Sequence, residues 1–77
     1  MNGDQCRMGR AALRWSLDDL AEKARVGRAT IARFETGTAA RAETVTLIRA
    51  ALEAGGVVII DGGEASASGG AGVRLTT

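Results

Sequence analysis

The chain has 77 residues, a formal net charge of +1, one cysteine, no histidine and only two aromatic side chains, Trp15 and Phe34. One cysteine excludes an intramolecular disulfide and a cysteine-based zinc site, and the lack of histidine removes the commonest metal ligand and the commonest general base. We therefore expect neither an enzyme nor a metal or other cofactor.

One small domain with an aliphatic core is expected from this length and composition, and pairing with a second copy is one way to add burial. The sequence contains no run of about 18 apolar residues and no signal-peptide pattern, which predicts a cytoplasmic protein that does not bind membranes. It leaves no room for a ligand-sensing domain, so no small-molecule ligand is predicted.

The first predicted helix covers residues 4–14. Asp4 is its candidate N-cap, and Cys6, Gly9 or Arg10, and Leu13 recur at helical spacing. Glycine inside a helix costs about 1 kcal/mol relative to alanine. A close crossing with another helix would explain a residue without a side chain there.

A second helix is predicted to begin after Ser16 and to end near Ala24. Ser16 is a good N-cap, and Asp19 stands three residues later, as in a capping box. A helix of about two turns has little stability of its own and must rest on its neighbours. The turn that follows is expected around residues 25–27.

The third predicted helix runs from Arg28 to Thr36, with Gly27 as its N-cap and Gly37 in the left-handed position that ends it. Helical spacing places the apolar residues after the turn on the inner side: Val26, Ile31 and Phe34. The opposite, outward side holds small residues flanked by arginines: Arg28, Ala29, Ala32 and Arg33.

A fourth helix is predicted at residues 42–54, with Gly55 as its stop, and the pattern then changes to short β-branched runs at 57–60 and 72–76. The segment between them, residues 61–72, is rich in glycine, serine and alanine and is expected to be mobile. The predicted fold class is therefore mainly α: a four-helix domain over residues 1–54, followed by a C-terminal β-strand or hairpin over residues 55–77.

The stretch "WSLDDLAEKARVGRATIARFETG" resembles the lambda-repressor-like family (Cro/CI-type, XRE) of bacterial and phage helix-turn-helix DNA-binding regulators. The resemblance covers about residues 4–54. Its motif positions stand at the family's intervals: Ser16, Leu20, Ala21, Val26, Thr30, Ile31, Phe34, Glu35 and Gly37.

What the resemblance implies about DNA contacts divides into two sets. In the family the third helix enters the major groove, so the base-reading candidates are Arg28, Ala29 and Arg33, with Gly27 and Ala32 close to the groove. The phosphate-contact candidates are Ser16, Leu17, Thr30, Thr36, Thr38 and Arg41. The alternative is that the arginines of the third helix form a solvated face.

The resemblance also implies an ion pair between Arg10 on the first helix and Glu35 at the end of the third, in a structural role. Two departures from the family pattern stand out. Arg25 replaces a glycine at a position that often needs positive φ, which costs about 1 kcal/mol or more. Leu17 replaces a polar side chain that would bind a phosphate.

The β-branched run at 57–60 places Val57 and Ile59 on one face and Val58 and Ile60 on the other. Burying both faces is hard for a monomer of this size, which favours a homodimer with the tail in its interface. The predicted interface residues are Val57, Val58, Ile59, Ile60, Val73 and Leu75. The alternative is a hairpin folded back on the helices of its own chain.

The function predicted from these patterns is a sequence-specific, double-stranded DNA-binding transcription regulator, most simply a dimeric repressor. An alternative is an antitoxin or antiactivator that uses the same scaffold and the C-terminal strand to bind a regulatory protein partner.

Overall fold

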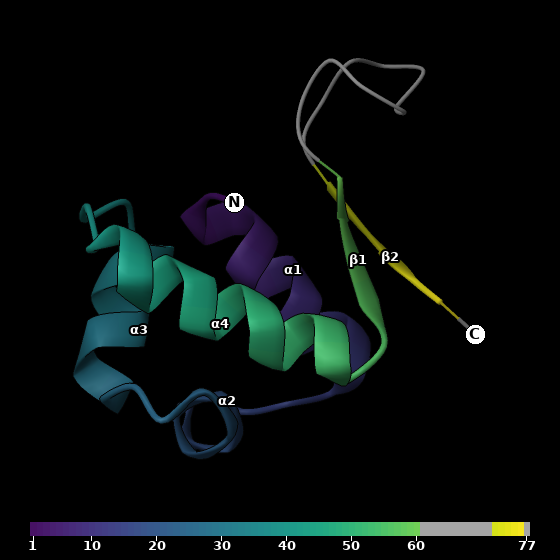
Figure 1. Ribbon diagram of the computed structural model, residues 1–77, viewed down its shortest axis with the longest axis horizontal. Coiled ribbons are helices and arrows are strands. Elements are labelled where there is room, and N and C mark those ends of the chain that lie inside the picture. Colours follow the sequence, from purple (N-terminus) through teal and green to yellow (C-terminus); the bar gives the residue numbers. More distant parts are fainter. Residues whose placement is uncertain (61–71, 77) are drawn as a thin grey trace.

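The computed structural model describes residues 1–60 and 72–76. Its elements in chain order are α1 (Gly3–Leu13), α2 (Leu17–Ala24), α3 (Arg28–Glu35), α4 (Ala42–Ala54), β1 (Val57–Ile60) and β2 (Gly72–Leu75). The prediction of a mainly α fold with four helices before a C-terminal hairpin is confirmed (Figure 1). Within the described ranges, none of the helices combines the length and the hydropathy needed to cross a membrane.

The start of α1 differs from the prediction, because its N-cap is Asn2 and not Asp4. The Asn2 side chain accepts a hydrogen bond from the backbone of Gln5 at 2.9 Å, and the Gln5 side chain accepts one from the backbone of Asn2 at 2.8 Å. This capping box satisfies two N–H groups at once. Asp4 therefore lies inside the first turn, where its negative charge faces the positive end of the helix.

The predicted start and end of α2 are confirmed. Ser16 and Asp19 form the reciprocal capping box, with distances of 2.8 and 3.0 Å between backbone nitrogen and side-chain oxygen. At the other end Arg25 is the C-cap and has a left-handed backbone with φ of 57°. Arg14, which ends α1, has the same conformation with φ of 59° and was not predicted to.

The end of α3 lies one residue earlier than predicted, with Thr36 as its C-cap. Gly37 has φ of 104°, and its N–H donates to the carbonyl of Phe34 at 3.1 Å, while the N–H of Thr38 donates to Arg33 at 3.0 Å. These two bonds form the Schellman motif that glycine favours at this position. The predicted role of Gly37 is confirmed.

One aliphatic core joins all four helices and the hairpin. Its largest fully buried hydrophobic side chains are Leu20, Ile31, Ile48, Leu52, Val57 and Cys6. The close crossing expected at Gly9 is present, because a Cβ built there would lie 3.1 Å from Cδ1 of Leu52 on α4. A methyl group at this position would require the side chain of Leu52 to move by a few tenths of an ångström.

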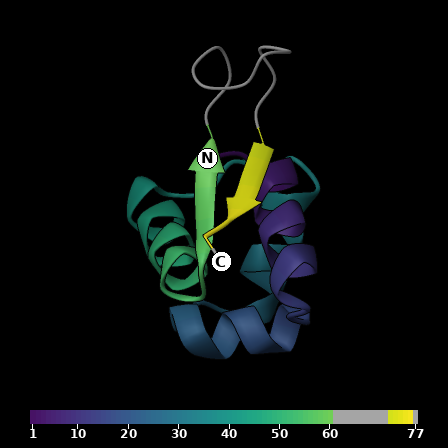
Figure 2. The ribbon, with the colours of Figure 1, turned by 90° about the vertical axis from the view of Figure 1, so that its right-hand side faces the viewer.

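The strands β1 and β2 pair with each other in antiparallel register, with Ile59 opposite Val73 and Val57 opposite Leu75. The inner face carries Val57 and Ile59, which are buried, whereas Val58 and Ile60 on the other face are half-buried. The alternation predicted for this run is therefore confirmed. Within the single chain the hairpin lies over α1 and α4 (Figure 2). Residues 61–71 of the segment predicted to be mobile lie outside the described residues.

Gln5 fastens the hairpin to α1. Its side chain is buried, and Nε2 donates to the carbonyl of Ile60 at 2.7 Å and to that of Gly72 at 3.2 Å. These two carbonyls belong to the cross-strand pair next to the inter-strand segment. One amide therefore joins the cap of α1 to both strands of the hairpin.

Candidate nucleic-acid interface

The apolar inner face of α3 packs into the core, which leaves its outer face exposed to solvent. Ile31 and Phe34 are buried in the core, whereas Arg28, Ala29 and Arg33 are exposed. Ala32, the fourth residue predicted on the outer side, is half-buried. The helix therefore offers a surface of small residues with an arginine at its start and another near its end.

The turn before α3 fixes the direction in which this face points. Arg25 has a left-handed backbone, and the N–H of the next residue, Val26, donates to the carbonyl of Ala21 at 3.1 Å. Gly27 then caps α3 without a side-chain hydrogen bond. A change of direction completed within three residues leaves α2 and α3 packed against each other.

A hollow between α3 and the start of α4 brings together residues from both predicted sets of DNA contacts. Thr30, Arg33, Thr38 and Arg41 all line it, together with Thr44. A neighbouring hollow extends this surface toward the turn before α3, and it is lined by Arg25, Val26, Gly27, Thr30, Arg41, Glu43, Thr44, Thr46 and Leu47. Hydroxyl and guanidinium groups, with the carboxylate of Glu43 among them, thus line the side of α3 that faces α4.

Three of the predicted phosphate-contact residues lie elsewhere. Thr36 lines a different hollow near the start of α1, and its hydroxyl donates to the carbonyl of Arg33 at 2.9 Å. Ser16 caps α2, and the side chain of Leu17 packs against the core. At this end of α2 the available phosphate donors are the hydroxyl proton of Ser16, whose oxygen accepts the capping bond, and the first backbone N–H groups, which have no partner within the helix.

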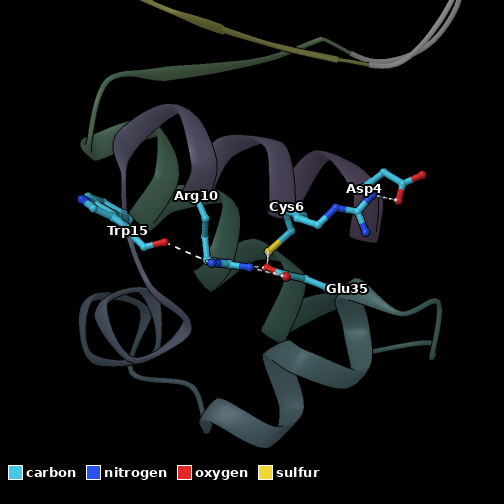
Figure 3. Close-up of polar contacts among 6 residues, drawn as sticks. Asp4, Cys6, Arg10, Trp15 and Glu35 are labelled. Carbon is cyan, nitrogen blue, oxygen red and sulfur yellow. Dashed lines mark hydrogen bonds and ion pairs between the residues drawn. The ribbon is translucent and has the colours of Figure 1, made fainter.

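Glu35, the last residue of α3, forms an ion pair with Arg10 of α1. Arg10 Nε and Nη2 each approach a carboxylate oxygen of Glu35 at 2.7 Å, and Arg10 Nη1 donates to the carbonyl of Trp15 at 3.0 Å. The Cys6 thiol donates to the same carboxylate at 3.2 Å. Figure 3 shows Cys6 and Arg10 both directed at Glu35, which ties the end of α3 to α1.

This environment shifts two pKa values. Burial alone would raise the pKa of the Glu35 carboxyl, but hydrogen bonds from Arg10 and Cys6 outweigh it and hold the pKa below its ordinary value. Burial, with the hydrogen bond to Glu35, raises the pKa of the Cys6 thiol to about 12. The thiol therefore stays protonated at neutral pH and does not act as a nucleophile.

An ion pair that the sequence did not predict lies at the edge of this surface. Arg28 Nε lies 2.9 Å from Asp18 Oδ1, and both side chains are well exposed. Asp18 is the second residue of α2 and Arg28 is the first of α3. Their ten-residue separation follows no helical spacing, so only the angle between the helices brings them together.

The family model that describes a helix-turn-helix, HTH_3, matches residues 7–55. The chain belongs to this family. The matched range covers most of α1 and all of α2, α3 and α4, and it ends before β1, so the hairpin lies outside the family model. A comparison with curated proteins found no match.

Membership of the helix-turn-helix family confirms the resemblance to Cro/CI-type and XRE domains. The family implies DNA binding, with regulation of transcription as the associated role, and its domains are typically not enzymes. In a helix-turn-helix the second helix of the motif is the one that enters the major groove. That helix is α3 in this chain.

Proposed function

We propose that this chain is a sequence-specific, double-stranded DNA-binding transcription regulator that reads the major groove with α3 and acts as a dimeric repressor. The observation that supports this best is the outer face of α3, where Arg28, Ala29 and Arg33 are exposed beside a hollow lined by hydroxyl and guanidinium groups. A regulator of this kind occludes a promoter when it occupies its site.

Base reading is assigned to Arg28, Ala29 and Arg33, with Gly27 and Ala32 close to the groove. The planar guanidinium of arginine can hold O6 and N7 of guanine through two hydrogen bonds, and each such contact discriminates by about 1–3 kcal/mol. A methyl side chain such as that of Ala29 packs against the methyl group of thymine. The small residues also let the helix approach the base edges closely.

Phosphate contacts are assigned around this face, where they fix the register of the protein on the duplex. Thr30 of α3 and Thr38 and Arg41 of the loop before α4 line one hollow between the two helices. The backbone N–H groups after Ser16, including that of Leu17, lie at the positive end of α2, which attracts phosphate. Thr36 is the remaining candidate, at the far end of α3.

The dimer is proposed to form through the outer face and the edges of the hairpin. Val58 and Ile60 lie on that face, opposite Arg74 and Gly72 of β2. Leu75 pairs with Val57 on the inner face, but at the end of β2 its exposed fraction is still 44%. An open two-stranded sheet also leaves unpaired backbone groups at its edges. Because the hairpin lies on the opposite side of the molecule from α3, a dimer of this kind would leave both α3 helices accessible to DNA.

Selection of binding sites from a pool of random duplex DNA, with the purified chain at moderate salt, tests the proposal. The expected result is an enriched inverted repeat with guanines in each half-site and half-sites about one helical turn, roughly 34 Å, apart. Folded protein that enriches no sequence would contradict the proposal. It would favour the alternative function, a module that binds a regulatory protein partner.

A further inference from the structure

We infer that Asp18 is a positioning residue for base recognition: it holds Arg28 so that the end of the guanidinium faces guanine, and it sets how strictly that base is selected. This inference rests on the proposed function. It concerns an acidic residue on a surface expected to approach DNA, where a negative charge would ordinarily weaken binding.

Asp18 contacts the guanidinium of Arg28 at its side. Asp18 Oδ1 lies 2.9 Å from Nε of Arg28. Nε is on the side of the guanidinium, whereas the two terminal nitrogens form its end. A carboxylate held at the side leaves the end of the fork available for O6 and N7 of guanine.

The Arg28 side chain loses conformational entropy when it binds a base. The exposed fraction of the Arg28 side chain is 61%, so without a partner it would sample many rotamers. Ordering such a side chain on binding costs about 0.5–1.5 kcal/mol. If a carboxylate already restrains Arg28 before DNA binds, less ordering free energy is lost on binding. This gain applies only to a site whose guanine accepts the restrained conformation of Arg28. Discrimination between bases therefore increases.

The negative charge of Asp18 lowers the affinity for any duplex. Phosphate attraction supplies the affinity that is independent of sequence, and an acidic side chain near the duplex lowers it. Removing the charge of Asp18 should therefore strengthen binding to any duplex and weaken discrimination at the guanine. A simple ion pair without a role in recognition would not lower discrimination.

The test compares Asp18→Asn with the wild-type chain on two duplexes: the selected site, and the same site with the guanine that Arg28 faces replaced. The ratio of the two dissociation constants should fall about two- to tenfold, which corresponds to the ordering cost above. Affinity for the replaced site should rise. Asp18→Glu, which keeps the charge, should restore part of the ratio.

Glu22→Gln is the matched control, because Glu22 is exposed one turn further along the same side of α2. It removes the same charge and should leave the ratio unchanged. In an Arg28→Ala background, Asp18→Asn should have no further effect on the ratio. These three results together would establish the positioning role.

An unchanged ratio in Asp18→Asn would overturn the inference while leaving the proposed function intact, since the wild-type chain would still select its site. An equal change of the ratio in Glu22→Gln would overturn it as well, because the effect would then be one of net charge. A wild-type chain that distinguishes no duplex from another would overturn both proposals.

Discussion

Glu35 is the residue through which the orientation of α3 depends on α1. Its carboxylate receives two bonds from Arg10 at 2.7 Å, and the exposed fractions of the two side chains are only 17% and 7%. A buried pair of this kind is costly to break by removing one partner, because the other charge remains buried without compensation.

Glu35→Gln should lower the free energy of unfolding by about 3 kcal/mol, measured by urea denaturation with an unchanged m-value. Asp4→Asn is the matched control, since the Arg7–Asp4 pair is exposed on both sides. That change should cost about 1 kcal/mol or less. Equal losses in the two variants would contradict a structural role for the Arg10–Glu35 pair.

The lowered pKa of Glu35 predicts how stability depends on pH. A carboxyl whose pKa is lower in the folded chain than in the unfolded one stabilises the fold above its ordinary pKa, and this contribution is lost as pH falls through the folded value. The free energy of unfolding should therefore decline on acidification below about pH 4.5. Glu35→Gln should flatten that decline in urea titrations between pH 7 and 3. Parallel curves for the two proteins would rule out Glu35 as the group responsible.

For single residues, the sequence predicts a side-chain contact only where a known motif pairs the two positions. The partnership of Arg10 and Glu35 came from the resemblance to a known family. The Asp18–Arg28 pair and the bonds of Gln5 to the hairpin could not be predicted, because both depend on how separate elements pack. The spacing of these residues along the chain carries no signal of either contact.

The turn between α2 and α3 is the element that places the outer face of α3. Its tightness depends on the left-handed backbone of Arg25, a conformation that costs a residue with a Cβ about 1–2 kcal/mol. The side chain of Arg25 lines the hollow that also contains Arg41. The position therefore gains a positive charge near the expected phosphates at the expense of stability.

Arg25→Gly should raise the free energy of unfolding by about 1 kcal/mol, because glycine adopts this conformation without strain. The same replacement inside α2, Glu22→Gly, should lower it by about 1 kcal/mol. Thermal or urea unfolding of the two variants measures both effects. Destabilisation by Arg25→Gly would show that the arginine side chain contributes more to the fold than its backbone conformation costs.

Helix ends were predictable where a single capping signal was present, as at Ser16 for α2 and Gly37 for α3. The start of α1 was misassigned because Asn2 and Asp4 are both good caps, and only the reciprocal bonds with Gln5 favour Asn2. A β-branched run such as 57–60 indicates a strand but not its partner.

At the scale of the whole molecule, the hairpin and α3 occupy opposite sides of one core. Val57 and Ile59 are part of that core, so a contact with a second copy must use the other face or the edges of the hairpin. Truncation after Gly55 should weaken dimerisation, but it would also remove two core residues. Substitutions on the outer face are therefore the cleaner test.

Ile60→Lys and Val58→Lys should each weaken dimerisation at least about tenfold, measured by sedimentation at several concentrations, because the two-fold symmetric interface would bring like charges together. Both side chains are half-buried on the outer face, so the helical signal in circular dichroism should persist. Wild-type protein that sediments as a monomer, or variants that remain dimeric, would refute an interface at the hairpin.

In the proposed function, α3 reads guanine edges in the major groove through Arg28 and Arg33. The most direct test replaces guanine by 7-deazaguanine, which lacks the N7 acceptor, at single positions of the selected site. The wild-type chain should lose affinity when the guanine facing Arg28 is modified. Arg28→Ala should show no loss at that position and should retain the loss at the guanine facing Arg33. Equal affinity of the wild-type chain for the modified and unmodified duplexes would contradict recognition of guanine by α3.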